Sequence, residues 1–163
     1  MTENELAIEK IKHSYVRIIN EKPFYGIMLA YMRFVIDDNI DNVSTDAKNI
    51  YFNRKFLMKL TDNELYYLLQ HEIMHIMFQH MFRRNGRIKN LFNLACDIVV
   101  DSWLINELKF EKEDFSTIEY PIHTALNGVE GKSIRQKKFM ICLSKKTVAS
   151  ALCQKSVVMV AKL

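Results

Sequence analysis

Apolar residues recur every three or four positions along most of this chain, a spacing that is typical of amphipathic helices. Residues 4–20 show it with Leu6, Ile11, Tyr15 and Ile18, and Pro23 lies just beyond the expected helix end. Residues 24–36 are apolar almost throughout and predict a second, buried helix. Residues 90–108 are mostly apolar and predict another long helix.

The middle of the chain shows a different pattern, a short strand signal followed by a capped helix. The polar segment TDAKN at residues 45–49 separates two short runs typical of strands, which predicts a hairpin over residues 43–53. Thr61 then precedes Glu64 by three positions, the capping-box spacing that starts a helix. We expect this helix to run to about Arg84, before an Asn-Gly pair that favours left-handed backbone. The fold class expected is α+β and mostly helical, with a small hairpin beside the capped helix.

Length and composition indicate one ordered domain. The chain has 163 residues, with four Gly and two Pro, and no linker-like segment is visible. The N-terminus lacks the apolar core of a signal peptide, and no window reaches the roughly 20 apolar residues of a membrane span. We therefore expect a cytoplasmic protein. The three cysteines, an odd number without close pairing, are interpreted as free thiols: Cys96, Cys142 and Cys153.

The charge changes abruptly near residue 132. The net charge is +4, yet residues 132–163 hold eight Lys/Arg and no acid, which leaves 15 basic against 19 acidic residues in residues 1–131. We expect one domain over residues 1–131 and a basic tail over residues 132–163. The tail is interpreted either as a reading-frame change, hence a non-native continuation, or as a genuine basic segment that binds an acidic partner or nucleic acid. Because a frame change would remove any evolved reason for the charge, nucleic acid is not expected as a partner.

Chemistry concentrates in QHEIMHIMFQH, residues 70–80. On a helix His71 and His75 lie about 40° apart around the axis, so both imidazoles project from one face, as two ligands of one zinc ion require. Glu72 lies beside the pair, where it can act on a water as a general base. This is the HExxH arrangement of zinc peptidases, and the alternative is a helix with buried or surface histidines.

A catalytic zinc needs a third protein ligand. Asp97 and Asp101 lie four apart on the later apolar helix; Asp97 is the expected ligand and Asp101 the expected acid behind the ligands, unless both flank a solvent-facing groove. His80 is nine residues after His71. If the helix continues, His80 points about 180° away from His71, so we expect a hydrogen-bonded core or helix-end histidine rather than a ligand.

Four blocks of the sequence, in order, resemble one family. They are PFYGIMLAYM, STDAKNIYFNRKF, LTDNELYYLLQHEIMHIMFQHMFRR and LFNLACDIVVDSWL. The chain resembles the bacterial family of putative metallopeptidases whose longer members carry a von Willebrand factor A-like domain after the peptidase-like domain. The resemblance implies a zincin-like domain with His71 and His75 as metal ligands, Glu72 as general base and Asp97 as third ligand. His80 matches a family position as well.

The resemblance also has departures and functional consequences. Phe92 stands where the family often has Trp, and Asp101 where it often has Asn, which adds negative charge near the expected site. Family members often occur alongside AAA-type ATPases. The expected function is zinc-dependent hydrolysis of a peptide or protein substrate. The alternative is a truncated, non-catalytic metal-binding module that acts as partner of an AAA-type ATPase, because the chain is too short for the von Willebrand factor A-like domain.

Overall fold

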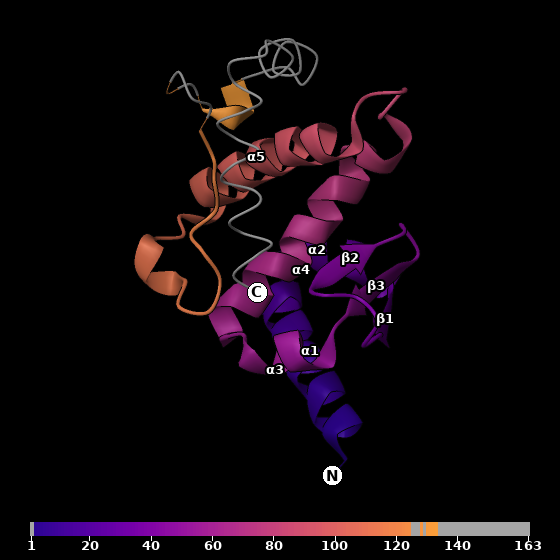
Figure 1. Cartoon of the computed structure of the whole chain (residues 1–163). Coiled ribbons are helices and arrows are strands. Elements are labelled where there is room, and N and C mark those ends of the chain that lie inside the picture. Colours follow the sequence, from indigo (N-terminus) through magenta and orange to yellow (C-terminus); the bar gives the residue numbers. More distant parts are fainter. Residues whose placement is uncertain (1, 125–127, 129, 134–163) are drawn as a thin grey trace. The chain divides into compact units, whose positions relative to one another are not determined.

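A computed structural model describes residues 2–124, 128 and 130–133 of the chain (Figure 1). These residues fall into two compact units. Of the described residues, the first unit comprises 2–81 and Leu108–Tyr120, and the second comprises Phe82–Glu107 and those between 121 and 133. Nearly all of the basic tail expected over residues 132–163, with Cys142 and Cys153, lies outside the described residues, so its interpretation stays a prediction.

The first unit consists of a group of helices with a small sheet beside them (Figure 1). Its helices are α1 (Glu3–Glu21), α2 (Pro23–Ala30), α3 (Arg54–Lys59) and α4 (Asp62–Met77), with the 3₁₀ turns η1 (His80–Phe82) and η2 (Lys112–Asp114). The expected first helix is confirmed as α1, and the capping-box start of the next long helix is confirmed as α4. Both begin with the same reciprocal cap, in which a threonine hydroxyl accepts from a backbone N–H while a glutamate accepts from the threonine N–H.

The sheet of the first unit has the described strand order β1–β3–β2. Its strands are β1 (Arg33–Ile36), β2 (Val43–Thr45) and β3 (Asn49–Phe52). β2 and β3 are antiparallel and form the predicted hairpin, while β1 lies parallel to β3. Ile50 and Phe52 of β3 are fully buried, so one face of the sheet contributes to the core. The mostly helical α+β fold class is confirmed.

The helix expected over residues 24–36 is wrong in its second half. α2 ends at Ala30, and Arg33–Ile36 forms the strand β1 instead. Its residues pair in parallel with β3, so their apolar character reflects a place in the sheet rather than on a helix. α2 is also less buried than expected, because Phe24 and Ile27 are more than half exposed.

α4 also ends earlier than expected. It stops at Met77 rather than near Arg84, and Gln79 follows with a φ of 54°. This value lies in the left-handed region, which an α-helix does not visit, so the chain reverses here without a glycine. The Asn85-Gly86 pair has left-handed backbone as expected, but it belongs to the turn before the next helix.

The second unit contains α5 (Lys89–Leu108) and the 3₁₀ turn η3 (Gly131–Ser133). The long helix expected over residues 90–108 is therefore confirmed. Ser102 donates a hydrogen bond from its hydroxyl to Glu130 at 2.8 Å, and a Cβ built on Gly131 would lie 2.4 Å from the Ile98 carbonyl oxygen. The segment at residues 130–133 thus packs directly on α5. Among the described helices of either unit, none is long and apolar enough to cross a membrane.

Candidate metal centre

The two histidines of the HEIMH motif come together on one face of α4. Nε2 of His71 lies 2.9 Å from Nε2 of His75, and the ring centroids are 4.6 Å apart. Two nitrogen donors on one tetrahedral zinc, each at about 2.0–2.1 Å from the ion, lie about 3.3 Å apart. The same nitrogen of each ring thus points to one place, at nearly the separation a shared ion requires. The pair fits a metal ion with a small adjustment of either ring.

Glu72 occupies the next position on α4, about 100° around the helix axis from His71. Its side chain is 8% exposed, so the glutamate is buried beside two half-buried imidazoles. The placement is compatible with the general-base role expected from the motif, and that role stays a prediction.

His80 does not lie where a continuous helix would carry it. The chain reversal at Gln79 returns the imidazole to α4, where Nδ1 of His80 lies 3.1 Å from Nδ1 of His75. The rings are nearly perpendicular, at 82°, with centroids 4.9 Å apart. The expected direction, about 180° from His71, is therefore wrong, because it assumed that the helix continues to Arg84. The expectation of a buried, hydrogen-bonded histidine at a helix end is confirmed.

The start of α4 is held by a carboxylate that the sequence interpretation treated only as a helix cap. One oxygen of Glu64 accepts a hydrogen bond from the Thr61 backbone N–H at 2.7 Å. The other oxygen accepts from three successive backbone N–H groups, those of Ser116, Thr117 and Ile118, at 2.8, 2.5 and 3.0 Å. Glu64 thereby ties the loop after α5 to the N-terminus of the helix that carries the histidines.

The electrostatics of Glu64 follow from these four donors. Burial alone raises the pKa of a carboxyl group, and Glu64 is fully buried. The backbone donors outweigh burial and bring the pKa of Glu64 from 4.5 down to about 2. The side chain is therefore charged at every pH at which the protein is expected to work. Nothing in the local sequence marks these donors, because backbone N–H groups are common to all residues except proline.

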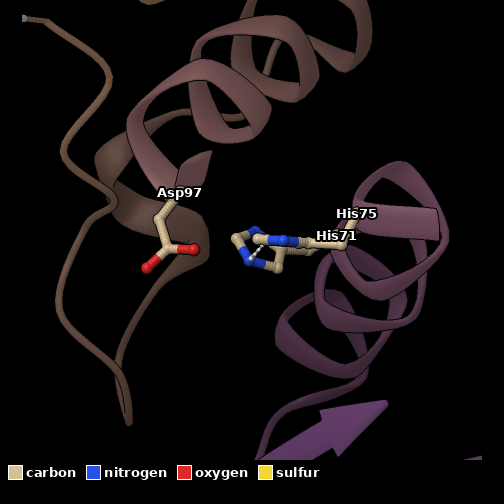
Figure 2. Close-up of side chains that lie close together, drawn as sticks. All are labelled: His71, His75 and Asp97. Atoms are coloured by element: carbon tan, nitrogen blue, oxygen red, sulfur yellow. Dashed lines mark hydrogen bonds between the residues drawn. The ribbon is translucent and has the colours of Figure 1, made fainter. Parts of the chain in front are cut away.

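The expected carboxylate ligand is carried by the other unit. Figure 2 shows the two imidazoles projecting from α4 and the Asp97 carboxylate on α5. Asp97 is half-buried, and Asp101, one turn later, is 7% exposed. The neighbouring Cys96 is a buried thiol; burial, and then the Asp97 carboxylate, raise the pKa of that thiol to about 12. Imidazole nitrogen and carboxylate oxygen are both ligand types found at zinc sites.

One concave feature of the first unit does not involve these residues. It is a cleft of about 200 Å³ lined in part by Arg17, Asn63 and Asp114. Its polar groups pair with one another, since Arg17 donates to Asn63 at 2.8 Å and Asn63 donates to Asp114 at 2.9 Å. Because these groups already satisfy one another, the cleft is interpreted as part of the packing of α1 on α4.

The fold and the histidine pair define a class of protein: a mostly helical α+β protein with an HExxH sequence on a capped helix. The chain belongs to the family described as a putative metallopeptidase domain, which it matches over residues 7–117. The match includes all of α4 and α5, and it ends at Thr117, within the loop that Glu64 binds. No curated protein and no solved structure matched the chain.

Proposed function

We propose that this chain is a zinc-dependent metallopeptidase whose metal is held by His71, His75 and Asp97. The observation that carries the proposal is the convergence of the two Nε2 atoms, 2.9 Å apart, on one helix of a chain that belongs to a metallopeptidase-like family. Imidazole nitrogens with one carboxylate oxygen are typical of catalytic zinc, which keeps a further position for water. Asp97 is proposed because it lies within the same family domain as the histidines and offers the missing carboxylate.

The proposed reaction is hydrolysis of a peptide bond. Bound zinc would supply Lewis-acid chemistry, lowering the pKa of water to about 7 and stabilising negative charge on a carbonyl oxygen. Glu72 takes one proton from the attacking water, whose oxygen forms the new bond to the carbonyl carbon. Glu72 then delivers that proton to the amine nitrogen as the C–N bond breaks. One water is consumed, and the products are a carboxylic acid and an amine.

The first unit also offers a surface for an extended peptide. β2 is an edge of the described sheet, since β3 lies between β1 and β2. Edge strands bind extended peptides through main-chain hydrogen bonds, independently of most side chains. We therefore propose that a peptide or protein substrate aligns along β2. We also propose that the protein works in the cytoplasm.

The direct test is hydrolysis of a mixed peptide library by the zinc-loaded chain, followed by mass spectrometry. Wild type is expected to cleave, and Glu72→Gln is expected to retain zinc while its rate falls by at least about 100-fold. Glu113→Gln, at an exposed position in η2, is the matched control and should cleave as wild type does. Equal cleavage by Glu72→Gln would refute the mechanism. A chain that binds zinc and cleaves nothing would instead favour the non-catalytic module that acts with an AAA-type ATPase.

A further inference from the structure

The contact between His80 and His75 suggests a role that the HExxH motif does not include. The two ring nitrogens of an imidazole point to opposite sides of the ring. In His75, Nε2 faces Nε2 of His71, while Nδ1 faces Nδ1 of His80. The nitrogen that would bind the metal and the nitrogen that meets His80 are therefore different atoms of one ring.

We infer that His80 is a positioning residue, which accepts a hydrogen bond from Nδ1–H of His75 and so keeps Nε2 of His75 available to the metal. The inference rests on the proposed function. A neutral imidazole carries one hydrogen, on either nitrogen. If the hydrogen is on Nδ1 of His75, the lone pair is on Nε2, which is the form that binds metal. Histidine ligands usually donate their other N–H to such an acceptor, which sets their tautomer and orientation.

The opposite arrangement would exclude metal from His75. If His80 donated through its own Nδ1–H, the hydrogen of His75 would have to lie on Nε2, directed at His71 and not available for ligation. The 3.1 Å contact thus has one direction that agrees with metal binding. In that direction His80 carries its hydrogen on Nε2, and its Nδ1 is the acceptor.

The backbone conformation of the residue before His80 brings the His80 ring into this contact. Gln79 is exposed and has a φ of 54°, a left-handed conformation that is unfavourable for a non-glycine residue. The strained residue directly precedes His80, which is 4% exposed. A helix that simply continued would avoid this cost but would carry the imidazole to the other face. The reversal therefore places His80 against His75 at an energetic cost that packing must offset.

The same geometry argues against His80 as a metal ligand. Its Nδ1 lies against the side of the His75 ring that faces away from His71. An ion bound between the two Nε2 atoms would lie on the opposite side of that ring. His80 therefore acts on the metal through His75, and its contribution depends on an acceptor atom at one position rather than on imidazole chemistry as such.

This dependence allows a sharp test with three substitutions. The amide oxygen of Asn occupies nearly the place of histidine Nδ1, whereas the longer Gln places its amide near Nε2, and Phe offers no acceptor. Zinc affinity is measured by competition with a chelator. We expect His80→Asn to stay within about threefold of wild type, and His80→Gln and His80→Phe to bind about 10–100-fold more weakly. His13→Phe, at an exposed position on α1, is the matched control and should bind as wild type does.

The second readout is the tautomer of His75 in the metal-free chain, from long-range nitrogen–proton NMR on isotope-labelled histidine. Wild type and His80→Asn should carry the hydrogen on Nδ1 of His75. A hydrogen on Nε2 in wild type would overturn the inference, and so would a folded His80→Phe that binds zinc as tightly as wild type. An Asn variant as weak as the Phe variant would overturn it as well. If wild type binds no zinc, the proposed function fails, and the tautomer in the metal-free chain still decides whether His80 accepts from His75.

Discussion

Replacement of Glu64 by glutamine tests how the histidine-bearing helix is held in place. The substitution keeps the size of the side chain but removes its charge and turns one accepting oxygen into a donating NH₂ group. That group would face either the Thr61 N–H or the three N–H groups of residues 116–118. At least one buried donor would lose its acceptor.

The size of the effect follows from the pKa of Glu64. A fall from 4.5 to about 2 is about 2.5 pKa units, or about 3 kcal/mol of preference for the charged form in the folded state. The side chain is fully buried, so solvent screening does not reduce this figure much. For a chain of this size, a loss of about 3 kcal/mol lowers the melting temperature by about 6–12 °C.

The assay is urea unfolding of wild type and Glu64→Gln at several pH values. The folded-state pKa of Glu64 is depressed, so its stabilisation is fully present above about pH 4.5 and is lost as pH falls through about 2. The difference between the two proteins should therefore shrink between about pH 5 and 2. Glu5→Gln is the matched control, because Glu5 forms the same cap on α1 but is exposed, and its effect should be several-fold smaller. A Glu64→Gln difference no larger than that of Glu5→Gln at neutral pH would refute the reasoning.

Substitutions at three further positions have defined outcomes. Gln79→Gly should leave the free energy of unfolding unchanged or raise it by up to about 1 kcal/mol, because glycine adopts a left-handed φ without strain. Gln79→Val should lower the free energy of unfolding by about 1–3 kcal/mol in urea titrations, because a β-branched residue resists a left-handed φ. Equal effects of the two substitutions would contradict this reasoning. Burial, and then the Glu21 carboxylate, raise the pKa of Tyr66 from 10.0 to about 12. Ionisation of Tyr66 therefore favours unfolding, and the stability that the neutral side chain contributes is lost as pH rises from about 10 through 12. Tyr66→Phe should flatten the decline of unfolding free energy over that range, and an unchanged decline would argue against it. In Gly26→Ala the new Cβ would lie 2.8 Å from Cα of Ile19, and this overlap should lower the free energy of unfolding by about 1–3 kcal/mol in thermal melts. An unchanged melting temperature would contradict this, because it would mean that α2 can shift away from α1 without a cost in stability.

The features predictable from the sequence are those determined by residues close together in the chain. The start of α4 follows from Thr61 and Glu64, three positions apart, because a capping box involves one helical turn. The common face of His71 and His75 follows from the helical period alone. The hairpin follows from a polar turn between two short runs.

The features that escaped prediction depend on distant parts of the chain. Arg33–Ile36 is a strand because β3, more than a dozen residues later, pairs with it in parallel, and a short apolar run does not by itself distinguish strand from helix. α4 ends at Met77 although no Gly or Pro follows within two residues, so the position of His80 had no local signal. Glu64 meets its loop donors 52–54 positions later, and those donors are backbone groups.

The central claim is that His71 and His75 bind one metal ion, and metal content of the purified chain tests it most directly. Elemental mass spectrometry should find about one zinc per wild-type chain. His71→Ala and His75→Ala should each lose the zinc, Asp97→Asn should bind it more weakly, and Glu72→Gln and the surface variant His13→Ala should retain it. Full zinc occupancy in a folded His71→Ala chain would contradict the account.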